Sequence, residues 1–479
     1  MGAGRTISFR DNVAHRHGDV YRSSAIFYVP PTDGVQTTIS FLNYWSLKRD
    51  LQVAVLASVR TMAGELVGRE RLRFEAGMVI NYRPPVERGF EGSVEIEVLS
   101  IENMAVPYAA MIAWYESSLG TTLVHSYARA YSPHEVEEGR TVTRGREGCW
   151  TVGDDARTRS FGVFHNGSAA VPAQRLRLGM RNAAGDYREV HFDLPALRPY
   201  ETIRVEPGLM IDGLEEFLGG QPGQAELDFE LGGGFTRMLV GNQRRDGSDL
   251  QVTHSNFNYA IQATDMAGAD ACGWMEVPAA LRERHAEVLV YPQSVPGRYR
   301  VRAPGLEHSF ASGAQVLLAP AAPSTLEFSA AQGEFPTRLV TALRVDGGQG
   351  RLVNECSLGV ITGLQPPKRL WWGPLRCDAA QSRLVVHDLA PVYGGIPADA
   401  PISLRLFSTA HLEPLERVLP SSALPGLGEG VAIGELWPQA QTFLGGEPGY
   451  YTLYCPYGGL TAYTLTCNAH GSVSLEHGF

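Results

Sequence analysis

The chain is built from short apolar segments separated by turn residues, and it has few stretches with helical periodicity. Several segments combine β-branched and apolar residues with a partial alternation of apolar and polar positions, which predicts strands. These segments lie at 38–43, 51–60, 176–180, 187–194, 202–205, 225–231 and 238–240. Strands of this length, interrupted by Gly, Pro and Asp every 8–12 residues or so, are typical of β-sandwiches.

Two segments favour helices, and both are short. Residues 212–218 begin with Asp212 as a possible N-cap and are followed by Gly219 as a possible C-cap, which predicts about two helical turns. Residues 278–287 begin with Pro278, a residue suited to a first helical turn. Neither segment is long enough to organise a domain, so we expect an all-β protein.

An internal repeat organises the chain. The sequence FLGGQPG at 217–223 recurs as FLGGEPG at 443–449, with six of seven positions identical. Nearby positions align in the same order, among them Trp150 with Trp372 and His254 with His477. The period is longer than that of common helical repeats or propeller blades, and it has the size of a small domain.

We therefore predict a tandem array of about four related β-sandwich units. The expected boundaries are 20–133, 146–260, 275–363 and 367–479, after an N-terminal tail at 1–19. The third unit is shortened because it lacks the FLGG segment, and our alignment places Glu355 where the other units carry the repeated histidine.

Composition limits the partners and the compartment. The 479 residues are 44% hydrophobic and 19% charged, with a net charge of −10, so neither nucleic acid nor an anionic membrane is the expected main partner. We see no secretory signal and no run long enough to span a membrane. Six cysteines are scattered without a CxxC pair, which favours free thiols and a cytoplasmic location.

The first candidate site residues are the repeated histidines His125, His254 and His477. Each ends a predicted strand, so each unit could hold a ligand or a metal ion there. Alternatively, each imidazole could tie its closing strand to a neighbouring loop by hydrogen bonds. We favour this structural interpretation, because a feature repeated in every unit usually belongs to the fold.

A second repeated pair is His165-Asn166, which aligns with His387-Asp388. A histidine beside a carboxylate could orient a general base. However, neighbouring residues of a strand point to opposite faces, and Asn and Asp suit a turn. We favour the turn interpretation for both pairs.

Near the N-terminus, His15, His17 and Asp19 form an H-x-H-x-D pattern. On an extended strand the three side chains would share one face, as metal ligands can. A polar terminal tail is the simpler interpretation. We therefore predict neither a metal ion nor a cofactor.

Aromatic clusters give the last candidates. Exposed Trp and Tyr rings can serve as platforms for sugars or as anchors at interfaces. Trp150 and Trp372 occupy equivalent repeat positions and are expected in cores, whereas Trp45 and Trp371 are the better surface candidates.

Nucleotide-binding, hydrolase and kinase motifs are absent from the sequence, so we assign no catalytic residue. The favoured function is a non-catalytic binding or assembly protein that associates with itself, as a homo-oligomer, or with another protein. One alternative is a carbohydrate-binding or carbohydrate-processing protein with aromatic platforms between units. A second alternative is a metal-dependent enzyme that uses the histidines.

Overall fold

The protein is described by a computed structural model. It describes residues 20–73, 75–104, 111–125, 129–130, 143–144, 148–232, 237–256, 266–293, 295–337, 339–346, 348, 351–363 and 367–478. Strands dominate these ranges and helices are short, so the chain is all-β, as predicted. The strands form antiparallel sheets that fall into four consecutive groups along the chain.

The first unit contains two sheets, in the strand orders β4-β3-β6-β1-β9 and β5-β2-β7-β8. The outer strand β4 is mostly exposed and carries alternating charges, which protects a free sheet edge from pairing with other chains. Its elements are β1 (Arg22–Val29), β2 (Val35–Leu42), α2 (Tyr44–Arg49), β3 (Ala54–Thr61), β4 (Leu66–Leu72), β5 (Val79–Tyr82), β6 (Gly92–Leu99), β7 (Ile112–Ser117), β8 (Thr121–His125) and β9 (Arg129–Ala130).

The second unit has the sheets β11-β16-β13-β14 and β15-β12-β18-β19, and a small ladder of β10 with β17. Its elements are β10 (Thr143–Arg144), β11 (Cys149–Val152), β12 (Thr158–His165), β13 (Gln174–Arg181), β14 (Tyr187–Leu194), β15 (Thr202–Val205), α4 (Pro207–Met210), α5 (Leu214–Leu218), β16 (Gly223–Asp228), β17 (Glu230–Leu231), β18 (Leu239–Arg244) and β19 (Leu250–His254). β13 and β14 pair as an antiparallel hairpin, at the strands expected at 176–180 and 187–194.

The third unit has the sheets β24-β23-β26-β21-β30 and β25-β22-β28-β29, and a short ladder of β20 with β27. Its elements are β20 (Met266–Gly268), β21 (Cys272–Val277), η1 (Ala279–Leu281), β22 (Ala286–Val290), β23 (Gly297–Ala303), β24 (Leu306–Ala311), β25 (Val316–Leu318), β26 (Ser324–Gly333), β27 (Phe335–Pro336), β28 (Val340–Val345), β29 (Asn354–Gly359) and β30 (Ile361–Thr362). The helix predicted at 278–287 was wrong in extent: a single 3-10 turn, η1, is followed by strand β22, whose apolar residues pack into the core.

The fourth unit has the sheets β31-β36-β33-β34 and β35-β32-β37-β38. Its elements are β31 (Leu370–Leu375), β32 (Ala380–Asp388), α6 (Ala390–Tyr393), β33 (Ile402–Phe407), β34 (Leu415–Leu419), η2 (Ser421–Ala423), α7 (Leu424–Glu429), β35 (Val431–Ala432), α8 (Ile433–Leu436), α9 (Ala440–Leu444), β36 (Gly449–Tyr454), β37 (Leu460–Asn468) and β38 (Val473–His477).

All four units share one topology. If the eight principal strands of a unit are lettered a to h in chain order, one sheet always runs d-c-f-a and the other always runs e-b-g-h.

Local backbone geometry explains why the glycines of the repeated sequence FLGG(Q/E)PG recur in the second and fourth units. In each, the helix before the glycines ends on a left-handed glycine, Gly219 or Gly445. The last glycine of the motif, Gly223 or Gly449, leaves room for a leucine side chain that a Cβ atom would meet at 2.5 Å or less.

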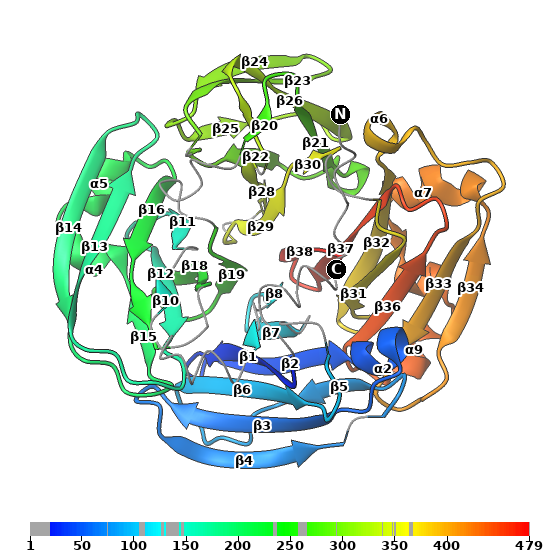
Figure 1. Ribbon diagram of the computed structural model, residues 1–479, viewed down its shortest axis with the longest axis horizontal. Coiled ribbons are helices and arrows are strands. Elements are labelled where there is room, and N and C mark those ends of the chain that lie inside the picture. The colour runs from blue at the N-terminus through cyan, green and yellow to red at the C-terminus, as the bar shows by residue number, and fades with distance from the viewer. Residues whose placement is uncertain are drawn as a thin grey trace.

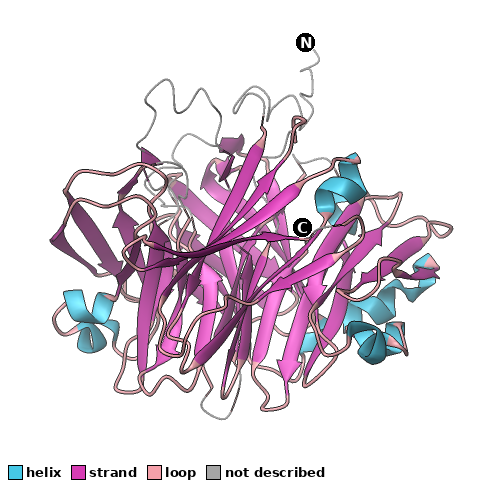
Figure 2. Ribbon diagram, turned by 90° about the horizontal axis from the view of Figure 1, so that it is seen from below, coloured by secondary structure: helices cyan, strands magenta, loops and turns pink. Residues whose placement is uncertain are grey.

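The four units form a closed ring, with short helices near its outer edge (Figures 1 and 2). The final strand of each unit lies innermost. We call these strands, β8, β19, β29 and β38, the closing strands. Each contacts the closing strands of both neighbouring units, from β8 to β19, β29, β38 and back to β8. The ends of four distant chain segments therefore meet at one axis.

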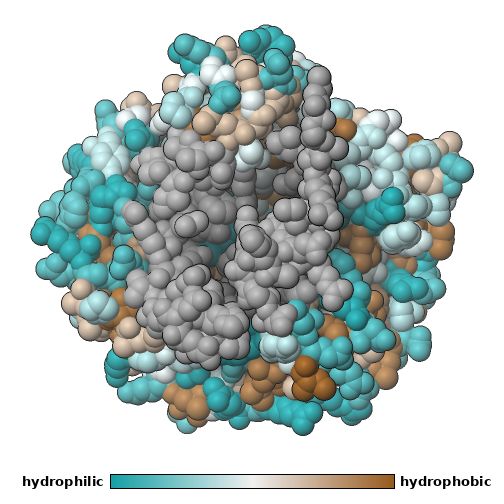
Figure 3. Space-filling view, in the orientation of Figure 1, coloured by the Kyte–Doolittle hydropathy of each residue, from teal (hydrophilic) through white to brown (hydrophobic). Residues whose placement is uncertain are grey.

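Apolar side chains fill the interior of each unit, and additional buried groups lie between units. Around the rim of the face in Figure 3, hydrophobic residues of the described part are scattered among hydrophilic ones. Within the described ranges, no helix combines the length and the apolar character that a membrane crossing needs.

Candidate functional site

The three repeated histidines meet at the ring axis. The closing strands β8, β19 and β38 end with His125, His254 and His477. Each histidine is the fifth residue of its strand. The ring centroid of His125 is 4.4 Å from that of His254 and 4.9 Å from that of His477. One ring nitrogen from each histidine lies within 4.8 Å of one from each of the others. The structure thus forms one shared cluster from three unit ends.

The third unit places a leucine at this position, and our alignment of Glu355 with the repeated histidines was wrong. The closing strand β29 begins at Asn354, and its fifth residue is the buried Leu358. The connection 346–353 between β28 and β29 is longer than the connection 245–249 between β18 and β19, so an alignment through the connection shifts the register. The Glu355 carboxylate instead accepts hydrogen bonds from Thr151 and Tyr291, between the second and third units.

Polar side chains join the closing strands at the axis. Asn354 donates to Oε1 of Gln251 at 2.9 Å and accepts from the backbone N–H of Leu475 at 3.1 Å, so it links three units. The backbone N–H of Leu123 donates to Oγ of Ser474 at 3.2 Å. Because buried polar groups need partners, these complementary contacts specify how the units dock.

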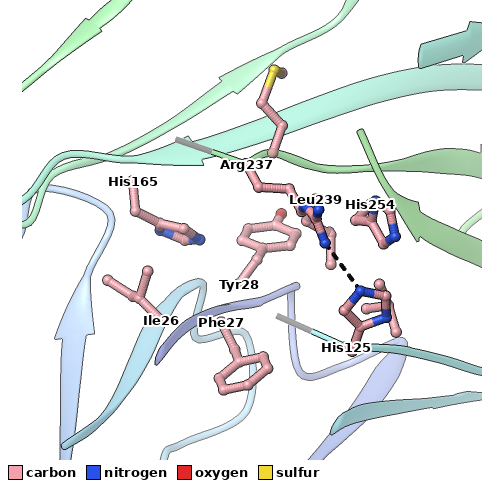
Figure 4. Close-up of a pocket in the computed structure, with 10 residues that line it drawn as sticks. Ile26, Phe27, Tyr28, His125, His165, Arg237, Leu239 and His254 are labelled. Carbon is pink, nitrogen blue, oxygen red and sulfur yellow. Dashed lines mark hydrogen bonds between the residues drawn. The ribbon is translucent and has the colours of Figure 1, made fainter. Parts of the chain in front are cut away.

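Glu476 and Arg237 complete the group around the histidines. Glu476 Oε1 lies 3.2 Å from Nδ1 of His125, and its Oε2 accepts from the His125 backbone N–H at 3.3 Å. Arg237 Nη1 lies 3.0 Å from Nε2 of His125 (Figure 4). We call the three histidines with Arg237 and Glu476 the axial cluster.

The hydrogen bonds fix the tautomer of each imidazole. Nδ1 of His254 lies 2.8 Å from the carbonyl oxygen of Ser255, and Nδ1 of His477 lies 3.1 Å from that of Gly478. A carbonyl oxygen only accepts, so both Nδ1 atoms carry the proton. In His125, Arg237 donates to Nε2, so its Nδ1 carries the proton that Glu476 accepts. Each Nε2 is therefore an acceptor rather than a donor, and in His125 it accepts from Arg237.

Burial keeps the imidazoles neutral. It lowers the pKa of His477 to about 4, although the nearby Glu476 carboxylate opposes this shift. Burial, together with the charge of Arg237, lowers the pKa of His254 well below its ordinary value. Burial also raises the pKa of Glu476 to about 7. At neutral pH the imidazoles of His254 and His477 are thus uncharged, next to the permanent guanidinium cation of Arg237.

A small cavity adjoins the cluster and is lined by His125, His254, Arg237, Tyr28 and His165, among others. In the view of Figure 4, His165 lies across Tyr28 and Arg237 from the other two histidines. Its Nδ1 is 2.9 Å from Oγ1 of Thr202, and burial lowers its pKa to about 3. His165 is therefore a neighbour of the axial cluster rather than a member of it.

Asn166 and Asp388, which follow His165 and His387, hold neighbouring loops by hydrogen bonds. The Asn166 amide donates to the carbonyl oxygens of Ala169 and Arg198, both at 2.8 Å. Asp388 accepts from the Ile396 backbone N–H at 2.8 Å and from the Tyr457 hydroxyl at 2.9 Å. His387 lies near the ring of Tyr463, and burial lowers its pKa to about 4.

The two tryptophans expected at the surface have different surroundings. Trp45 is only 1% exposed, so its assignment as a surface platform was wrong. It lies in helix α2, which the sequence did not predict and which Asn43 caps through its side chain. Trp371 is partly exposed, but Lys368 Nζ lies 3.9 Å from its ring centroid. Trp150 and Trp372 are buried.

His15, His17 and Asp19 lie outside the described residues. Two members of the axial cluster, Arg237 and Glu476, were not candidates. Glu476 directly precedes a repeated histidine, but the corresponding residues before His125 and His254 are Val124 and Thr253, so no repeat signal marked it.

Comparisons with known proteins assign no family. No protein-family model matches the chain, and no curated protein matches it. One solved structure with a match is a Bacteroides uniformis β-glucuronidase 2, at 8% identity and a TM-score of 0.13. The match covers 50% of this chain and 26% of that chain. A likeness this weak carries no argument about fold or function.

Proposed function

We propose that this chain is a non-catalytic binding protein, a ring of four β-sandwich units that holds a small ligand at its axis. The observation that carries the proposal is the meeting of His125, His254 and His477, from three units, beside Arg237 and Glu476. The imidazoles, the guanidinium and the carboxyl group meet beside a small cavity, and together they are polar groups that can recognise a ligand.

The pKa values of His254 and His477 do not suit these two residues to act as general bases. A general base works best with a pKa near the working pH. The His477 imidazole, with a pKa of about 4, is a weak base, and the pKa of His254 is also far below neutrality. This favours ligand recognition by these two histidines over acid–base catalysis by them.

The carbohydrate alternative has less support. It needs flat, accessible rings between units, whereas Trp45 is buried and Lys368 covers a face of Trp371. Self-association between copies is not needed to cover the closing strands, because the closing strands of one chain already contact one another. We further propose a cytoplasmic location. The structure describes all six cysteines, and all are free thiols, as suits a reducing compartment.

Ligand-dependent thermal stability tests the proposal. A ligand that binds only the folded state raises Tm, and the shift grows with the logarithm of the ligand concentration above Kd. We expect at least one of three classes, divalent metal ions, small carboxylates or phosphates, to raise the Tm of the wild type but not of the variant His254→Gln/His477→Gln. Stabilisation that survives in this variant would place binding elsewhere, and a lack of response to all three classes at millimolar concentration would contradict the proposal.

A further inference from the structure

We infer that the axial cluster is a binding site for one divalent transition-metal ion, with His125, His254 and His477 as its ligands. This inference rests on the proposed function and names the chemical class of its ligand. The ring nitrogens that could bind the ion lie within 4.8 Å of one another, although the histidines are more than 100 residues apart in the sequence. The meeting of three unit ends is therefore what creates the site.

The donor set selects the kind of ion. Neutral imidazole nitrogen suits Zn²⁺, Co²⁺, Ni²⁺ and Cu²⁺, whereas Mg²⁺ and Ca²⁺ prefer oxygen ligands. Three histidines with a fourth position left for water or another small ligand form a known type of zinc site.

The second layer of contacts also fits a metal site. A histidine that binds a metal usually donates its other N–H to a carboxylate or a backbone carbonyl, which orients the ring. Here the Nδ1 atoms face Glu476, the Ser255 carbonyl and the Gly478 carbonyl. Glu476 Oε1 is also 3.8 Å from Nε2 of His477, so a carboxyl group lies close to the position of the ion.

Arg237 occupies one of the proposed ligand nitrogens when no metal ion is bound. Its guanidinium lies against Nε2 of His125, the nitrogen that the ion would need. A tetrahedral ion with bonds of about 2.0–2.1 Å holds its ligand nitrogens about 3.4 Å apart. Binding therefore requires Arg237 to move away and the three rings to draw together. The arginine should weaken binding both as a competing donor and as a positive charge.

Titration of the full-length chain with Co²⁺, Zn²⁺ and Ni²⁺ tests this inference. We expect one Co²⁺ per chain, with the visible absorption of a four-coordinate site, and displacement of Co²⁺ by Zn²⁺. The variant His254→Gln/His477→Gln should lose this absorption. His165→Gln is the matched control, because it changes a buried histidine of the same cavity outside the cluster. It should keep the stoichiometry and the spectrum.

Two further variants test the roles of the neighbours. Arg237→Ala should bind the metal ion more tightly than the wild type, because the competing cation is gone. Glu476→Gln should bind it 10–100-fold more weakly, the usual effect of removing such a partner of a metal-binding histidine. If the double histidine variant fails to fold, the opposite shifts of these two variants still decide the question.

The outcomes separate this inference from the proposed function. If no metal ion binds the wild type at millimolar concentration, or if binding persists in the folded double histidine variant, the metal site is refuted. If carboxylates or phosphates then stabilise the wild type through the same histidines, the binding function stands with an anionic ligand instead. If these also have no effect, both proposals fail.

Discussion

Arg237, which directly precedes the last strands of the second unit, donates a hydrogen bond of 3.0 Å to Nε2 of His125 at the end of the first unit. This contact fixes the tautomer of His125, so that Nδ1–H faces Glu476 of the fourth unit. Three units are thus joined through one imidazole. We therefore expect this contact to contribute to the stability of the closed ring.

Replacing Arg237 should therefore weaken the folded protein. A hydrogen bond to a charged group contributes about 1.5–3 kcal/mol, so Arg237→Ala should lower the free energy of unfolding by an amount in that range. Urea denaturation monitored by tryptophan fluorescence measures the change. Arg198→Ala, which removes an exposed arginine, is the control and should have a small effect. Equal effects of the two substitutions would show that the Arg237–His125 contact contributes little.

Asn354 should be a second determinant of ring closure. Asn354→Ala removes both the donor to Gln251 and the acceptor for the Leu475 N–H, and it leaves these buried groups without those bonds. We expect a loss of about 1–3 kcal/mol in the free energy of unfolding. Asn354→Asp keeps the acceptor but not the donor, so it should repair the Leu475 contact only. An unchanged urea midpoint in Asn354→Ala would contradict this role.

The tryptophans give a prediction about packing. Trp45→Ala should lower the free energy of unfolding by about 3–5 kcal/mol, because it leaves a large cavity in a core where the ring is 1% exposed. Trp371→Ala should cost less, about 1 kcal/mol, because its ring is partly exposed. Chemical denaturation of both variants under the same conditions measures the difference. The reverse order would refute the assignment of Trp45 to the core.

Glu276 should make stability fall as the pH rises. Burial raises the pKa of its carboxyl group from 4.5 to about 7, and a hydrogen bond from Thr325 only partly opposes this shift. Between these two values the folded state keeps a proton that the unfolded state has lost, so each step up in pH favours unfolding. Glu276→Gln should remove this dependence and stabilise the protein at pH 8 by about 2–3 kcal/mol.

Urea denaturation at pH 5 and pH 8 checks this prediction against Glu283→Gln, which changes an exposed carboxylate of the same unit. If Glu276→Gln and Glu283→Gln show the same pH dependence, the raised pKa of Glu276 makes no contribution.

His165 should act in the opposite direction at acidic pH. Its pKa of about 3 in the folded state is below the ordinary value of 6.5, so in this window the unfolded state binds the extra proton. Stability associated with neutral His165 is complete above pH 6.5 and is lost as the pH falls toward 3. The variant His165→Gln should show a shallower loss, smaller by about 3 kcal/mol at pH 4.

Thermal unfolding between pH 4 and pH 7 measures this effect, with the exposed His191 replaced by Gln as the control. A loss of stability in His165→Gln as steep as in the wild type would contradict the prediction.

Local sequence patterns determined the strands and the repeat. The alternation at 187–194 corresponds to β14, and the FLGG motif marks the two places where a helix ends on a left-handed glycine. These features depend on residues close together in the chain, because side-chain periodicity and glycine conformation act locally. The same patterns overestimated the helix at 278–287, where burial of β22 in the core outweighed local helix propensity.

The site was decided by tertiary structure. The sequence marks His125, His254 and His477 as equivalent, but only closure of the ring of units brings the imidazoles of His254 and His477 to within 5 Å of that of His125. In the third unit the position equivalent to the histidines holds Leu358 instead of the expected Glu355, because the length of the preceding connection sets the register of β29. Docking of the units also brings Arg237 and Glu476 beside His125. Contacts between residues hundreds of positions apart depend on how whole units pack, and no local periodicity encodes that packing.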